Sequence, residues 1–227
     1  MIFLSSLTSD GGQYINTGIL PTGNTRLILD ADVTSADLGA LFGARSSYRS
    51  NGFALFVSEG HLQHDHGSSS AGVTASGTGR HLFEKRGNLL LMDGTLIHTG
   101  ENSTFSCPYP MAILSINSGG TMMTAYPVRA TVYSAQIYEG ETLLLDLVPA
   151  LAEDGTPGFY DKCTGGFYRN AGTGVFVPGT PLKETFSVEF TGLAKGREYV
   201  ARVYPVSPEG IYQSELGGQT ASAFTTS

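Results

Sequence analysis

The chain has 227 residues, of which 30 are glycine and 10 are proline, and only 15% of them are charged. This charged fraction is well below the roughly 25% of average soluble domains, and 41% of the residues are hydrophobic, which excludes a disordered chain and a coiled coil. The net charge of −7 argues against nucleic acid as a partner, because phosphate binding needs clustered Lys and Arg.

Stretches with a period of two residues dominate the chain, and no stretch has a period of 3.6. They are rich in Val, Ile, Tyr, Phe and Thr and are bounded by Gly, Pro, Asn and Asp, as strands are. Only residues 35–38 and 150–153 could form a helical turn. The expected strands are, in chain order, 13–18, 25–33, 38–45, 52–58, 61–66, 80–86, 89–92, 95–98, 111–117, 129–138, 142–148 and 166–170. Asp93-Gly94 predicts a type I′ hairpin turn. The pattern as a whole predicts an all-β, antiparallel sandwich.

Two prolines flank a glycine in the segment 177–181, which predicts a domain boundary. We therefore expect a large domain over residues 1–178 and a small one over 179–227. No apolar run approaches the roughly 18–20 residues of a membrane span, so we expect no membrane insertion. The N-terminal sequence MIFLSSLTSDGG lacks the basic region of a secretory signal. Cys107 and Cys163 have neither metal nor redox spacing, and we expect two unpaired thiols.

The small domain carries an alternating run at 186–190, and Leu193 stands six residues before Tyr199, with Gly196 between them. This pattern resembles the corner between strands E and F of a fibronectin type III module. Residues 199–204 then correspond to strand F, 205–210 to the turn and 220–226 to strand G, with Arg202 and Val203 also matching. A whole module needs roughly 100 residues. The resemblance therefore implies a partial module whose open face is covered by the large domain, another copy or a partner.

Three blocks of the large domain resemble the laminin-G/concanavalin A-like jelly rolls of tailed-bacteriophage and prophage virion proteins. They are residues 12–26, then 41–45 with Phe53 and Phe56, and finally 132–138, 146–150, 158–162 and 166–174. The resemblance implies a two-sheet antiparallel jelly roll in a non-catalytic tail, fiber or decoration protein. Such a protein would assemble in the host cytoplasm with other virion proteins, as a homo-oligomer such as a trimer, and would adhere to host-surface glycans. The alternatives are a bacterial surface glycan-binding protein and a glycoside hydrolase-like enzyme.

The loop 45–51 is the first candidate for ligand binding, because Arg45 and Arg49 offer forked donors, Tyr48 offers a ring and Asn51 an amide. Tyr109, between two prolines, is a second exposed aromatic candidate. The absence of Trp weakens the case for a lectin, and the alternative for the loop is an ordinary solvent-facing hairpin.

His64 and His66 would lie on one face of a strand and could share a transition metal, with three copies supplying six nitrogens around a threefold axis. The alternative is an exposed polar hairpin that leads into a flexible loop at 67–70. Neither interpretation implies an obligatory cofactor.

Asp30 and Asp32 also share a strand face, where they could bind calcium or another ligand, or simply meet solvent. A glycosidase needs two carboxylates roughly 5–10 Å apart, and the E-x-D-x-x-E run of glucanases is not found, so we expect no enzyme. Asp146, Tyr160, Asp161 and Asn170 are expected to bond the backbone of turns rather than a ligand.

Overall fold

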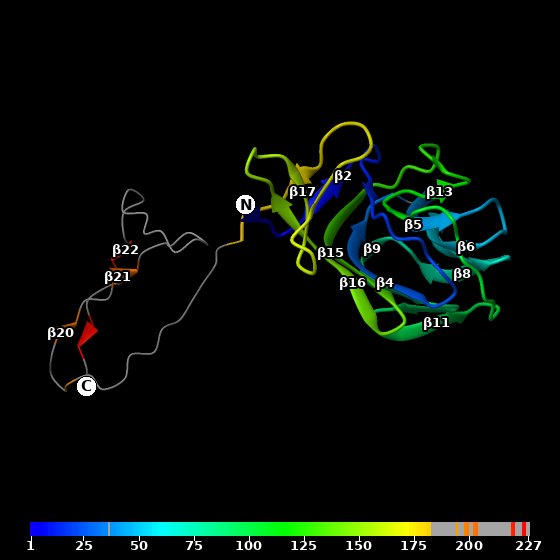
Figure 1. The fold of residues 1–227 in the computed structure, drawn as a ribbon, viewed down its shortest axis with the longest axis horizontal. Coiled ribbons are helices and arrows are strands. Elements are labelled where there is room, and N and C mark those ends of the chain that lie inside the picture. The colour runs from blue at the N-terminus through cyan, green and yellow to red at the C-terminus, as the bar shows by residue number, and fades with distance from the viewer. Residues whose placement is uncertain are drawn as a thin grey trace. The chain divides into compact units, whose positions relative to one another are not determined.

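The computed structural model describes residues 1–35 and 37–182, together with Ala194 and four pairs of residues nearer the C-terminus. The chain divides into two compact units, Met1–Leu182 and Lys183–Ser227. The large unit consists of two sheets packed face to face, one containing β4, β9, β15 and β16 and the other β5, β6 and β8 (Figure 1). No helix occurs among the described residues.

The first sheet has eleven strands, and the long central strands β4 and β15 pair over their whole length. Its main path runs β11 (Thr95–Thr99), β10 (Leu89–Met92), β9 (Gly79–Arg86), β4 (Thr25–Val33), β15 (Ala130–Glu139), β16 (Thr142–Leu151), β17 (Pro157–Asp161) and β18 (Phe167–Arg169). Three short strands add to its edges: β1 (Ile2–Phe3) on β16, β2 (Leu7–Ser9) on β15, and β19 (Val177–Pro178) on β2.

The second sheet has eight strands, in the order β14 (Thr121–Met122), β13 (Asn117–Ser118), β5 (Gly39–Arg45), β6 (Gly52–Ser58), β7 (His61–Gly67) and β8 (Ser69–Ser76). In addition, β12 (Ala112–Ile113) joins β5 to β3 (Ile15–Asn16). Every described strand pair is antiparallel except β13 with β5, which is parallel. The prediction of an all-β protein with two antiparallel sheets is therefore confirmed, with that one local exception.

The core fills the space between the sheets, because alternate side chains of each strand point inward. Strand β4 shows this most clearly, since its residues alternate between buried and partly exposed from end to end. The largest fully buried side chains include five phenylalanines, at positions 42, 53, 83, 159 and 176. Lys85 is the one charged residue among these largest buried side chains.

The predicted strands 25–33, 52–58 and 89–92 match the structure, and the Asp93–Gly94 turn has φ of 51° and 77°, as a type I′ hairpin requires. The predicted strand 111–117 is wrong as a continuous element, because Leu114 has φ of 64° and separates β12 from β13. The expected loop at 67–70 is also wrong, since from Ser69 the chain forms β8 against β7. The possible helical turn at 150–153 is wrong too, since Ala150 and Leu151 end β16.

The proline-containing segment 177–181 lies along the N-terminal strands. Val177 and Pro178 pair with Thr8 and Leu7, and the backbone N–H of Leu182 donates to the carbonyl of Phe3 at 2.8 Å. Proline is tolerated here because β19 is an edge strand, where a missing N–H costs no ladder bond. The chain thus stays bound to the large unit as far as Leu182.

In the C-terminal unit, β20 (Glu198–Tyr199) pairs with β23 (Phe224–Thr225), and β21 (Arg202–Val203) pairs with β22 (Gln219–Thr220). These antiparallel pairs overlap the two stretches expected as strands F and G, with Glu198 and Gln219 one residue before them. The expected strand at 186–190, Leu193, Gly196 and the turn at 205–210 lie outside the described residues.

Candidate functional site

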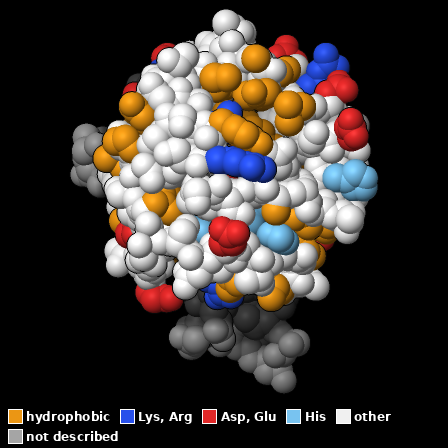
Figure 2. Space-filling model, turned by 90° about the vertical axis from the view of Figure 1, so that its right-hand side faces the viewer, with side chains coloured by type: hydrophobic (Ala, Val, Ile, Leu, Met, Phe, Trp, Pro, Cys, Tyr) orange, Lys and Arg blue, Asp and Glu red, His pale blue; other side chains and the backbone are white. Residues whose placement is uncertain are grey.

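A small pocket lies on the outer face of the second sheet. It is built by alternation: on β7, Gln63 and Asp65 face outward because His64 and His66 face the core, and on β6 Phe56 faces outward. Figure 2 views the side of the large unit where β5, β6 and β13 lie in Figure 1, and hydrophobic side chains gather there around a basic one. This Arg45 pocket has a volume of about 210 Å³.

The Arg45 pocket is the smaller of two hollows that share Tyr126 as a wall. It is lined by Leu38, Arg45, Tyr48, Phe56, Gln63 and Tyr126. The larger hollow has a volume of about 420 Å³.

The guanidinium of Arg45 is fixed in place by partners on two neighbouring strands. Its Nη1 lies 3.5 Å from Oδ2 of Asp65, and its Nε donates to the hydroxyl of Ser118 at 3.1 Å. The side chains of Arg45 and Asp65 are only 8% and 4% exposed, so the pair is largely removed from water. Gln63 donates to the hydroxyl of Ser70 at 3.0 Å. The polar floor of the pocket is therefore preorganised.

Aromatic rings form the walls above this floor. Tyr48 is 62% exposed, and the Arg45 guanidinium carbon lies 5.8 Å from the centroid of its ring and 5.7 Å from that of Phe56. Phe56 and Tyr126 meet edge to face, with centroids 6.0 Å apart. The pocket thus combines an exposed ring, a fixed cation and an amide, which is the combination that stacking and hydrogen bonding to a small polar ring require.

The structure brings only some of the predicted ligand-binding residues together. Arg45 and Tyr48 line the pocket. Arg49 lies on the same loop as Tyr48, with its guanidinium carbon 5.3 Å from the centroid of the Tyr48 ring. Asn51 instead donates to the hydroxyl of Ser46 and holds the loop, with φ of 49°. Tyr109 lies elsewhere, partly buried against the core.

His64 and His66 lie inside the sandwich, with 2% and 1% of their surfaces exposed. The expected common face is present, since the two rings stack with centroids 6.3 Å apart, but the expected exposed hairpin is wrong because this face points into the core. Lys85 reaches them from β9 in the opposite sheet. Its Nζ lies 2.6 Å from Nε2 of His64, 3.3 Å from Nδ1 of His66 and 2.9 Å from the carbonyl of Gly87, to which it donates.

Burial controls the charge of this cluster. Burial first, and then the neighbouring Lys85, lower the pKa of His64 to about 2 and that of His66 to about 4. Burial also lowers the pKa of Lys85 well below its ordinary value, with Asp65 opposing the shift. A metal held by both imidazoles would have to take the place of the lysine amine, and sharing it among copies would require both rings to leave the core. The transition-metal site stays a prediction.

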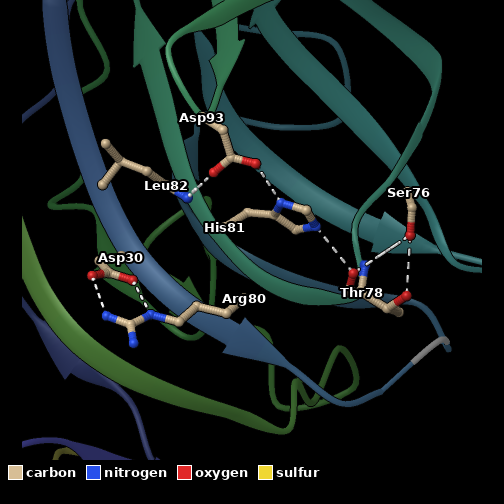
Figure 3. A network of polar contacts seen from close by, with 7 residues as sticks. All are labelled: Asp30, Ser76, Thr78, Arg80, His81, Leu82 and Asp93. Carbon is tan, nitrogen blue, oxygen red and sulfur yellow. Dashed lines mark hydrogen bonds and ion pairs between the residues drawn. The ribbon is translucent and has the colours of Figure 1, made fainter.

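Asp30 lies on the outer face of the first sheet, where both of its carboxylate oxygens accept from Arg80, at 3.0 and 2.9 Å (Figure 3). The Arg80 guanidinium carbon lies 3.6 Å from the ring centroid of Tyr133. Nearby, His81 lies 2.7 Å from Asp93, whose second oxygen accepts from the backbone N–H of Leu82. A cation at Asp30 would compete with an existing bidentate ion pair, so the calcium or ligand role of Asp30 and Asp32 stays a prediction.

Asp161 and Asn170 bond turn backbone groups, as expected, whereas the Asp146 carboxylate accepts from the Gln136 amide at 3.2 Å and lies 3.7 Å from Nζ of Lys162. Asp161 is fully buried and accepts from the backbone N–H groups of Asp146, Cys163 and Thr164 at 2.8 to 3.1 Å. Asn170 accepts from Tyr14 and Gly172. Cys107 is buried and Cys163 exposed, and neither forms a disulfide.

The sequence contained a signal for some of the residues that the predictions missed. Phe83 and Lys85 are two residues apart on one strand and therefore lie on the same face, so a buried Phe83 places Lys85 in the core. The same reasoning places Gln63 outside once His64 is inside. Tyr126 carried no such signal, because it lies beyond the ends of strands.

None of the described residues forms a helix of the length and apolarity needed to cross a bilayer. Comparison of the sequence with models of protein families and with curated proteins finds no match.

Proposed function

We propose that the chain is a non-catalytic structural protein of a tailed-phage or prophage virion that adheres to host-surface glycans. The large unit would be a concanavalin A-like jelly roll, and the C-terminal unit a partial fibronectin type III-like segment that docks into the assembly. The observation that carries the adhesive role is the Arg45 pocket, with its fixed guanidinium, its amide and the exposed ring of Tyr48.

The size of the pocket supports a weak, single-unit contact. Its volume of about 210 Å³ is below the roughly 300–1,000 Å³ of pockets that enclose drug-sized ligands, so it would take one sugar ring at a time. Such contacts become firm only when many copies act together, because the effective concentration of linked sites replaces intrinsic affinity. A homo-oligomer on a virion provides this multivalency.

An array of bacterial surface oligosaccharides, probed with the full-length chain, tests the adhesive role. Binding is expected for the wild type and is expected to be lost in Tyr48→Ala, which removes the exposed ring. Tyr138→Ala is the matched control, because Tyr138 also lies beside an arginine, with Arg26 5.0 Å from its centroid, but on the first sheet. Equal binding by Tyr48→Ala and wild type would contradict the proposal.

Two further measurements test the virion role. Light scattering of the purified chain is expected to give an oligomer, and the chain is expected to sediment with phage particles released from the producing cells. A monomer that is missing from such particles would instead favour the alternative of a bacterial glycan-binding protein.

A further inference from the structure

The larger hollow, of about 420 Å³, lies across Tyr126 from the Arg45 pocket. Segments far apart in the chain enclose it: the N-terminal segment at Gly11, Gly12 and Tyr14, the break between β12 and β13, the segment 123–127, and the turn at 171–173. Its volume falls within the roughly 300–1,000 Å³ of pockets that enclose small ligands.

The wall of this cavity carries five hydroxyl groups and no ionised side chain. The hydroxyls belong to Tyr14, Ser115, Thr124, Tyr126 and Thr173, and within the described residues no hydrogen bond from the protein engages any of them. Ser115 is 4% exposed, so its backbone is held firmly in the wall of the cavity.

The backbone around these hydroxyls is already satisfied and rigid. Ala171 donates to the carbonyl of Tyr14, and Thr173 donates to that of Gly12, both at 2.9 Å. Leu114, next to Ser115, has φ of 64°, a conformation that is unfavourable for a bulky residue. Its backbone N–H donates to the carbonyl of Leu41 at 2.7 Å. Backbone strain of this kind is maintained only where the surroundings impose it. The free polar groups of the cavity are therefore side-chain hydroxyls, held on a preformed wall.

This lining selects the chemistry of a ligand. A phosphate, carboxylate or ammonium group would lose its hydration without meeting an opposite charge, so an ionised ligand is disfavoured. The rings of Tyr14 and Tyr126, with Leu114, Met123 and Pro127, offer apolar surface between the hydroxyls. A ligand that matches both features has a C–H face and several hydroxyl groups, which describes an uncharged sugar ring.

We propose that this cavity is a second sugar subsite, for an uncharged hexose or N-acetylhexosamine unit, and that one oligosaccharide crosses Tyr126 to reach the Arg45 pocket. The inference rests on the proposed glycan-binding function and adds to it the class of sugar and a second contact. Tyr126 separates the two pockets and lines both, so neighbouring sugar units of one chain would contact its two sides.

The test is a titration of the isotopically labelled full-length chain with uncharged monosaccharides and trisaccharides of glucose, galactose and N-acetylglucosamine, followed by NMR. The backbone amide signals of Ser115, Thr124 and Gly172 are expected to shift with the monosaccharide. With a trisaccharide, signals near Tyr48 are expected to shift as well. The double variant Ser115→Ala/Thr124→Val removes two hydroxyls at nearly constant volume and is expected to weaken trisaccharide binding by about tenfold.

Thr121→Val on β14 is the matched control, because it removes a hydroxyl from an exposed threonine outside the cavity. The exposed Thr173→Val is the second cavity variant, in case the double variant does not fold. If Tyr48→Ala abolishes glycan binding while both cavity variants bind like wild type, the second subsite is wrong and the proposed function stands. If the cavity amides shift but Tyr48→Ala binds like wild type, the Arg45 pocket is wrong and the subsite stands. If no sugar shifts either set of signals, both are overturned.

Discussion

The Nζ atom of Lys85 lies 2.6 Å from Nε2 of His64, and this contact joins the two sheets through a polar group at the centre of an apolar core. Strand β9 supplies the lysine, and β7 supplies His64 and His66. The two buried imidazoles remain neutral there, because burial and the neighbouring Lys85 lower their pKa values, which avoids the cost of two further buried charges. Stability should therefore depend on keeping protons out of this cluster.

We expect the free energy of unfolding to fall as the pH drops from about 6.5 towards 4. The unfolded histidines bind protons near pH 6.5, whereas the folded pKa is about 4 for His66 and about 2 for His64. Between these values the unfolded state binds more protons, so each histidine contributes a slope of up to about 1.4 kcal/mol per pH unit. Urea denaturation across this range measures the slope. His66→Gln should make it shallower, with His61→Gln, at an exposed position of the same strand, as the control. A flat profile would contradict the prediction.

Asp161→Ala is expected to destabilise the large unit by about 3 kcal/mol or more, because it leaves several buried donors without an acceptor. Burial alone would raise the pKa of Asp161, but the hydrogen bonds from Thr164, Asp146 and Cys163 bring it below its ordinary value. The carboxylate thus contributes stability that is lost as the pH falls through this lowered pKa. Denaturation at neutral pH measures the loss. Asp154→Ala, at an exposed turn, is the control, and an equal effect of the two variants would refute the assignment.

Gly43→Ala should destabilise the second sheet by about 2 kcal/mol or more. Gly43 has φ of 154°, and a Cβ there would lie 2.7 Å from the carbonyl oxygen of Phe53 and closer still to Ala54. Gly72→Ala on β8 is the matched control, since nothing lies within 4 Å of its added carbon. Thermal unfolding compares the two, and similar melting temperatures would count against this account of the β5–β6 contact.

Calcium is expected to leave the melting temperature of the wild type unchanged, because both oxygens of Asp30 already accept from Arg80. A calcium-dependent rise that disappears in Asp30→Asn would show instead that the ion displaces the guanidinium. Asp37→Asn, outside this ion pair, is the control for the general effect of removing a carboxylate.

The sequence predicted the sheets well, because β4, β6 and β10 carry both a clear alternation and clear turn residues. It failed where the alternation was carried by small or polar side chains. Ser69–Ser76 looks like a loop in isolation and becomes β8 only because β7 pairs with it. Leu114 interrupts a predicted strand through a backbone conformation that nothing in its side chain announces.

The candidate sites were predicted less completely, for a related reason. A period of two residues places His64 and His66 on one face of the strand, but it does not show whether this face points to the core. In the structure it does, and Lys85 contacts His64 there from the other sheet. Arg45 and Tyr48 could be found from one loop. Tyr126 and Ser115 could not, because their neighbours in space come from distant parts of the chain.

The hydrogen bonds between residues 3–8 and 177–182 have a mechanical consequence. A pull on the chain beyond Leu182 meets the large unit first at the bond from Leu182 to Phe3, and then at those that join Thr180 to Ser5 and Gly179 to Ser6. These bonds would open one after another, so the edge would peel at low force. Peeling would stop at Phe176, which is 1% exposed and packs edge to face on Phe159. Residues 177–182 would thus extend first when the chain beyond Leu182 is pulled, before the force reaches the two sheets.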